Sequence, residues 1–125
     1  GDTSTISIVG NAGSVMENNS SGILLHIDIT RMVNEDTYLY LNVSDDGINR
    51  YSTTPPIEGD SFDGYFIRMF LPKNSTGVDL KIVPVNDAFK NGNHQVDFSL
   101  YNSNLGPCVR INSTSTYRLT IVDDE

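Results

Sequence analysis

Acidic side chains are the residues of this chain with the clearest potential for chemistry. The 125-residue sequence holds 16 Asp and Glu against 8 Lys and Arg. Ten of these acids fall in four segments, which are Glu17, then Asp45, Asp46, Glu58, Asp60 and Asp63, then Asp87, and finally Asp123, Asp124 and Glu125. Carboxylates held close together repel one another and raise one another's pKa unless a cation lies among them. Ca²⁺ suits such a place, because it takes about six to eight oxygens in flexible geometry.

The sequence offers little for catalysis, which needs a nucleophile, a base and an orienting group in one pocket. His26 and Asp28 are two positions apart and share the outer face of an expected strand. The simplest interpretation of His26 is a histidine on the protein surface. His94 is in phase with the apolar residues that follow it, so we expect it at the edge of the core rather than on a metal. Cys108 is the single cysteine, and no zinc-type Cys/His cluster or Gly-rich phosphate loop occurs. We therefore predict that the protein is not an enzyme.

The composition of the chain excludes nucleic acid and membrane surfaces as partners. The net charge is −8, and the few cations are scattered. Such a chain lacks the basic stripe that neutralises nucleic-acid phosphates, and anionic lipid headgroups would repel it. No run approaches the roughly 18 to 20 apolar residues of a membrane span. We expect one soluble domain over residues 1–125, forming a piece of a longer protein, with neither nucleic-acid binding nor direct membrane insertion.

Apolar residues recur at every second position, in short runs that Gly, Asn, Asp, Ser and Pro separate. This pattern predicts seven strands, at Thr3–Val9, Gly22–Thr30, Thr37–Ser44, Gly64–Leu71, Gly77–Val85, His94–Tyr101 and Tyr117–Val122. The segment Asp45–Asp63 reads as a long loop, and the pattern leaves the facing of Gly64–Leu71 undecided. The predicted fold is all-β, a seven-stranded antiparallel immunoglobulin-like β-sandwich.

Strand direction connects this fold to the acids. If successive strands alternate in direction, three inter-strand loops and the chain's last residues lie at the same end of the sandwich, and these are the segments that carry the ten acids. The residues leave two interpretations open. One is a set of solvated acidic loops, and the other is a metal site.

Several short motifs in order resemble those of the Calx-beta domain, a sandwich module of sodium/calcium exchangers, of an integrin subunit and of many bacterial surface proteins. They are Val15-Met16-Glu17-Asn18 before a strand, Phe70-Leu71-Pro72 before a turn, Leu80-Lys81-Ile82, Asn86-Asp87, Val96-Asp97-Phe98-Ser99-Leu100 and the terminal Thr120-Ile121-Val122-Asp123-Asp124-Glu125. The resemblance covers nearly the whole chain. It implies a Ca²⁺ site whose ligands, carried over by position, are Glu17, Asp60, Asp87, Asp123 and Asp124.

Some positions depart from the family pattern. Asn86 stands in place of the first of two paired aspartates, and Asn91 and His94 stand where the family has further acids. Calcium affinity depends on the charge of the ligands, so the resemblance implies one weak site or none.

The resulting functional prediction is a non-enzymatic structural or adhesive module that contacts neighbouring domains of the same polypeptide. We expect it in a cell-surface or secreted, extracellular protein, including the outer surface of bacteria. The alternative is a metal-free module that binds a carbohydrate or protein ligand through exposed tyrosines. Tyr38 and Tyr40 point outward from their strand, and Leu24 points outward from the strand before it, so adjacent strands would join them in one exposed patch.

Overall fold

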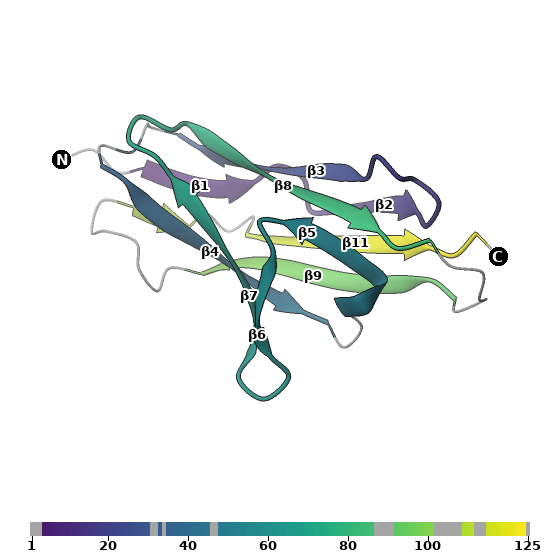
Figure 1. The fold of residues 1–125 in the computed structure, drawn as a ribbon. Helices are drawn as coiled ribbons and strands as arrows, with labels where there is room; N and C mark the ends of the chain where they lie inside the picture. The colour runs from purple at the N-terminus through teal and green to yellow at the C-terminus, as the bar shows by residue number, and fades with distance from the viewer. Residues whose placement is uncertain are drawn as a thin grey trace.

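The strands form two sheets that face each other across an apolar core (Figure 1). The computed structural model describes residues 4–30, 33, 35–45, 48–86, 92–101, 109–111 and 115–124. The five-stranded sheet has the order β10 (Val109–Ile111), β1 (Ser4–Ile8), β3 (Ile23–Ile29), β8 (Gly77–Pro84) and β5 (Tyr51–Thr54). The six-stranded sheet has the order β2 (Ala12–Met16), β11 (Thr116–Val122), β9 (His94–Tyr101), β4 (Thr37–Ser44), β7 (Gly64–Leu71) and β6 (Ile57–Asp60).

Alternation along each strand builds the core, because successive side chains point to opposite faces of a sheet. In β3, Leu25 and Ile27 are buried, whereas Leu24 and His26 point outward. The same alternation in β7 settles the facing that the sequence left undecided, with Ile67 buried and Phe70 turned to solvent. The predicted all-β sandwich is confirmed.

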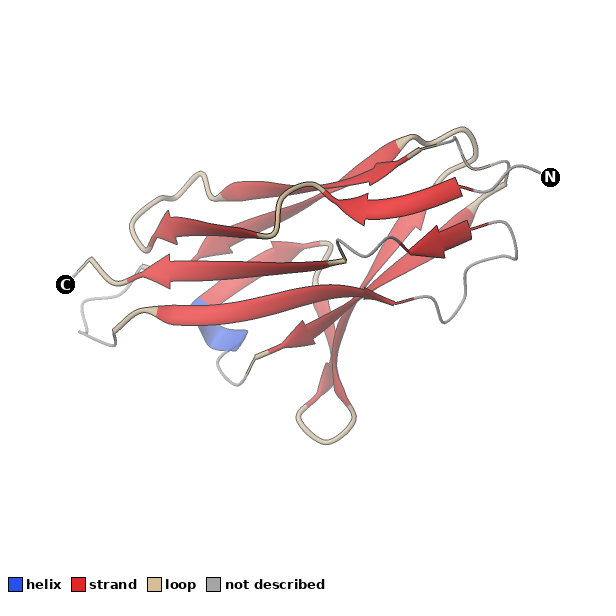
Figure 2. Cartoon of the chain, turned by 180° about the vertical axis from the view of Figure 1, so that it is seen from behind, coloured by secondary structure: helices blue, strands red, loops and turns tan. Residues whose placement is uncertain are grey.

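The predicted number of strands is wrong. Seven were expected, and the described residues form eleven. The segment that was read as a loop, Asp45–Asp63, contains the 3₁₀ turn η1 (Ile48–Arg50), β5 and β6. These strands have four residues each, too few for a period to be recognised, and Pro55 and Pro56 lie between them. Figure 2 shows the turn η1 and the strands that follow it.

The expectation of a purely antiparallel sandwich is also corrected. Strand β1 pairs with β10 in parallel, and β2 pairs with β11 in parallel. The chain passes from one sheet to the other between β1 and β2, at Gly10, whose φ of +88° is one that glycine adopts readily. Apolar residues at every second position show which side of a strand faces the core, but they do not show whether the neighbouring strand runs parallel or antiparallel to it.

The predicted patch of Leu24 with Tyr38 and Tyr40 does not exist. Leu24 points outward from β3 in the five-stranded sheet, whereas the two tyrosines belong to β4 in the six-stranded sheet. Strands that follow each other in the chain lie here in opposite layers.

Candidate metal centre

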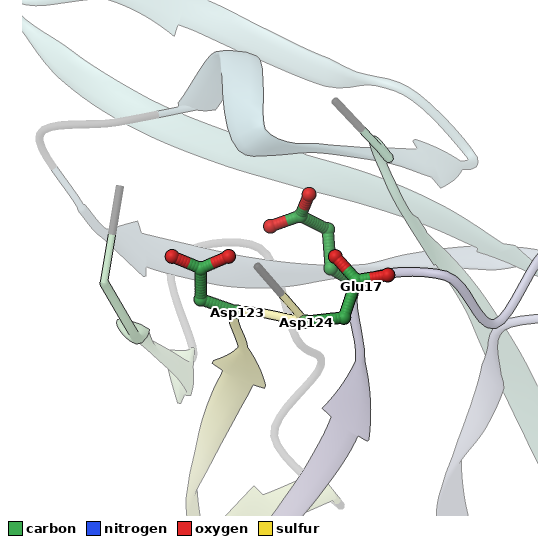
Figure 3. Close-up of side chains that lie close together, drawn as sticks. All are labelled: Glu17, Asp123 and Asp124. Carbon is green, nitrogen blue, oxygen red and sulfur yellow. The ribbon is translucent and has the colours of Figure 1, made fainter. Parts of the chain in front are cut away.

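The parallel pairing of β2 with β11 creates an acidic site at one end of the sandwich. Met16 pairs with Val122, and the Glu17 N–H donates a hydrogen bond of 2.9 Å to the Val122 carbonyl. Glu17 and Asp123, 106 positions apart in the sequence, therefore leave adjacent strands side by side. One carboxylate oxygen from each of Glu17, Asp123 and Asp124 lies within 4.8 Å of the others (Figure 3).

Glu17 is the buried member of this cluster. It is only 1% exposed. Removing a carboxylate from water is expensive unless opposite charge compensates it. The Arg50 guanidinium approaches it, with Nη2 3.9 Å from Glu17 Oε2, and the Arg50 side chain is itself only 19% exposed.

Hydrogen bonds connect Arg50 to the end of β11. Arg50 Nη2 donates to the Gly92 carbonyl at 3.0 Å, and the Gly92 N–H donates to Asp123 Oδ2 at 2.7 Å. The Asp123 N–H in turn donates to Asn93 Oδ1 at 3.0 Å. Residues 92 and 93 thus hold one carboxylate of the cluster in place.

Asp124 contributes an oxygen that is shielded from solvent. Its Oδ1 atom has no hydrogen-bond partner among the described residues. A shielded carboxylate oxygen close to two other carboxylates is a donor that a hard cation satisfies well.

A second buried carboxylate lies at the same end of the molecule. The Asp45 side chain is fully buried, and it accepts a 2.6 Å hydrogen bond from the Tyr51 hydroxyl. His94 Nε2 lies 2.7 Å from the other Asp45 oxygen. Burial, and then the hydrogen bond to Asp45, raise the pKa of the Tyr51 phenol far above its ordinary value, so the phenol stays protonated as a donor. This trio joins β4, β5 and β9 and lacks a nucleophile.

The structure brings together three of the five predicted ligands, Glu17, Asp123 and Asp124. Asp60 does not join them. It ends β6 at the tip of the β6–β7 hairpin, where its Oδ1 accepts hydrogen bonds from the Phe62 and Asp63 N–H groups. Asp87 lies outside the described residues, as does Cys108.

The argument from alternating strand directions therefore placed the segments that follow β2 and β11 correctly at one end of the sandwich. It misplaced the acids of β6 and of the turn that follows β6. Because β5 and β6 are strands, they carry Glu58 and Asp60 away from the acidic end. Sequence reasoning missed Gly92 and Asn93, since a backbone N–H and a carboxamide carry no charge signal.

His26 is an outward side chain, as predicted. It lies on β3, with Nδ1 2.8 Å from Asp79 Oδ1 of the adjacent β8 and Nε2 3.8 Å from Asp28. All three side chains are about half exposed, at 46% to 51%. The arrangement is a surface hydrogen bond between His26 and Asp79 across two paired strands, and exposed side-chain contacts of this kind contribute little to stability.

No helix in the described part of the chain has the length and apolar character needed to cross a membrane.

Solved structures with the same architecture are known. The apo form of the Calx CBD1 domain superimposes with a TM-score of 0.69 at 14% identity, over 99% of this chain and 100% of that one. The calcium binding domain CBD12 of CALX1.1 gives a TM-score of 0.67 at 13% identity, over 95% of this chain and 45% of that chain. A two-domain protein of unknown function from Bacteroides fragilis gives 0.59 at 12% identity, over 98% and 46%.

Neither a family model nor a curated protein sequence matches this chain. At identities this low, the likeness to the solved structures concerns the fold. The fold of this chain is that of the Calx-beta domains.

Proposed function

We propose that the protein is a non-enzymatic β-sandwich module that binds Ca²⁺ weakly between the β2–β3 turn and the end of β11. Glu17, Asp123 and Asp124 are the proposed ligands within the described residues, and Asp87 remains a predicted ligand outside them. The observation that carries the proposal is the convergence of these three carboxylates around one buried member, Glu17.

The charges and the donor set fit a divalent cation. Among the described residues, three carboxylates lie beside one guanidinium, and their charges sum to −2. All the candidate donors are oxygens, as hard cations prefer, and backbone carbonyls and water can complete the six to eight positions typical of Ca²⁺. Three carboxylate ligands with a competing arginine support weak rather than tight binding.

The ion would act by connecting segments that are distant in sequence. Glu17 follows β2, and Asp123 and Asp124 follow β11, so a shared cation crosslinks the last described residues to the β2–β3 turn. In a chain of several modules, this crosslink stiffens the connection to the next one. Stiffening of this kind suits a structural or adhesive unit of a cell-surface or secreted protein.

Thermal unfolding in EDTA and in millimolar CaCl₂ tests the proposal. A ligand at a hundred times its Kd adds about 2.7 kcal/mol to the free energy of unfolding. For a chain of this size, that gain raises the Tm by roughly 10 °C. Titration calorimetry with CaCl₂ alone then gives the Kd directly.

Matched variants locate the site. Asp123→Asn removes a proposed ligand charge and should abolish the calcium-dependent shift of the Tm. Asp63→Asn removes an exposed acid in the β6–β7 turn and should leave that shift unchanged. If the Tm of the unmodified protein is the same in EDTA and in CaCl₂, the calcium proposal is wrong.

A further inference from the structure

The β6–β7 hairpin presents an aromatic side chain to solvent. The two strands pair from Ile57 with Ile67 to Asp60 with Gly64, and the hairpin extends away from the body of the sandwich (Figures 1 and 2). Phe62, in the turn, is 93% exposed, whereas the next most exposed large apolar side chain among the described residues, Leu24, is 65% exposed. A single exposed Leu is ordinary on a protein surface, but a phenylalanine that is 93% exposed adds almost no buried apolar area to the core.

The turn that carries Phe62 is held by specific contacts. Asp60 Oδ1 accepts hydrogen bonds from the Phe62 N–H at 3.0 Å and from the Asp63 N–H at 2.7 Å. Gly59 and Gly64, on either side, have φ values of +93° and +97°, which glycine adopts readily. An apolar ring on an ordered turn loses little conformational entropy when it binds, which favours its use as an anchor.

Further aromatic side chains line the outer face of the sheet to which the hairpin belongs. Phe70, 47% exposed, packs on Tyr38, 45% exposed, with ring centroids 5.4 Å apart. Tyr40 packs between Phe66 at 6.1 Å and Tyr101 at 5.7 Å. The planes of neighbouring rings are inclined to one another by 42° to 54°, so the rings do not form one continuous flat surface. Tilted rings instead form an uneven apolar surface, which suits contact with a protein.

Charge indicates the kind of partner. Asp60 and Asp63 flank Phe62, and the domain carries a net charge of −8. An anionic membrane or a second copy of this chain would bring negative charge against these carboxylates. A protein with an apolar socket for Phe62 and a rim of Lys or Arg would instead meet both features.

We propose that the β6–β7 hairpin is a docking element, and that Phe62 inserts into an apolar socket rimmed by basic side chains on another protein. Asp60 orders the turn and, with Asp63, contributes charge to the contact. This inference does not depend on calcium, because the hairpin lies apart from the three-carboxylate cluster.

Selection from a random dodecapeptide phage library against the immobilised protein in EDTA tests the proposal. The expected peptides combine a Leu, Ile, Phe or Trp with two or more Lys or Arg. Their affinity, measured by fluorescence polarisation, should fall at least tenfold for Phe62→Ser. It should fall about threefold for Asp63→Asn, with weaker salt dependence, and stay unchanged for Leu24→Ser on the other sheet.

Several results would overturn the docking proposal. They are failure to enrich any peptide, enrichment of acidic peptides, and equal affinity of the peptides for the Phe62→Ser variant. Phe62-dependent sedimentation with vesicles of phosphatidylcholine and phosphatidylserine would assign the hairpin to a lipid surface instead. Phe62-dependent dimerisation in analytical ultracentrifugation would assign it to self-association.

Discussion

Arg50 makes two contacts at the acidic end of the molecule. Its guanidinium lies 3.9 Å from the buried Glu17, and it also donates to the Gly92 carbonyl. Arg50 thus opposes the charge of one proposed ligand while it holds the segment that contacts another. A protein cation in this position lowers the gain that Ca²⁺ can bring, in keeping with a weak site.

Replacement of this arginine should therefore have two opposite effects. Arg50→Gln removes a positive charge that lies 3.9 Å from the buried Glu17, and we expect the free energy of unfolding in EDTA to fall by roughly 2 to 4 kcal/mol. The same change should tighten Ca²⁺ binding in calorimetry, because the ion no longer competes with a guanidinium.

The control for this experiment is Arg68→Gln. Arg68 pairs with Glu58 at 3.6 Å, but both side chains are exposed, at 50% and 40%, so the expected loss is at most about 1 kcal/mol. Equal losses for the two variants would contradict the role given to Arg50.

Tyr51 makes the stability of the protein sensitive to alkali. The folded state raises the pKa of this phenol, so below pH 10, the ordinary value, the residue is neutral in the folded and unfolded states alike. Above pH 10, the unfolded chain ionises while the buried phenol does not. The stability that Tyr51 contributes is therefore complete below pH 10 and is lost as the pH rises further.

Urea unfolding at pH 8, 10 and 11 measures this effect against Tyr51→Phe. At pH 8 the variant should be less stable by about 1 to 3 kcal/mol, because Asp45 loses a buried donor. Above pH 10 that difference should shrink by up to about 1.4 kcal/mol per pH unit. Tyr38→Phe, at an exposed position, should show no such trend.

At the scale of elements, the parallel β2–β11 pair and the β2–β3 turn determine where Glu17 lies. Gly22 ends that turn with a φ of +68°, and its N–H donates to the Asn19 carbonyl at 3.2 Å. A Cβ atom at this position would meet the backbone carbonyl of Ile82 on β8. The turn between the two sheets thus requires glycine for its conformation and for close packing.

Gly22→Ala should accordingly destabilise the fold by roughly 2 to 4 kcal/mol, from unfavourable φ together with displacement of a backbone group. Gly64→Ala is the matched control, since its φ is +97° but no atom lies within 4 Å of the added Cβ. It should cost about 1 kcal/mol. Chemical denaturation distinguishes the two, and equal costs would show that close packing at Gly22 is unimportant.

At the scale of the whole molecule, stability comes from the apolar layer between the sheets. Leu25, Leu41, Ile67 and Phe98, from strands of both sheets, are between 0% and 2% exposed. Burial of this kind is the main favourable term in folding, and a cavity in such a layer is costly. The acidic end is therefore supported by an extensive apolar core.

Adjacent leucines in β3 test the facing of the sheets. Leu25→Ala should cost about 2 to 5 kcal/mol, because the side chain is 2% exposed and its loss leaves a cavity. Leu24→Ala should change the free energy of unfolding by no more than about 0.5 kcal/mol, since Leu24 is 65% exposed. Urea denaturation of both variants measures the difference, and similar costs would be inconsistent with the assigned facing.

The sequence by itself determined the all-β class, the two-layer sandwich and the position of the longer strands. Strands β4 and β9 were predicted with the bounds that the structure has. Alternation along a single strand encodes these features locally, because each residue of a half-buried strand must match its own face. Asp123 was recognisable for the same reason, since it directly follows such a strand. Glu17 was expected in a loop and instead follows β2 (Ala12–Met16), a strand that was not predicted.

Only the tertiary structure decided which strands pair in parallel, that β5 and β6 are strands, and which acids share a site. Pairing depends on contacts between residues far apart in the chain, and four-residue strands at sheet edges carry no period of their own. Asp60 and Glu17 thus look alike as acids between apolar runs. Asp60 lies at a projecting turn, whereas Glu17 lies beside Val122, because hydrogen bonds to partner strands position each of them.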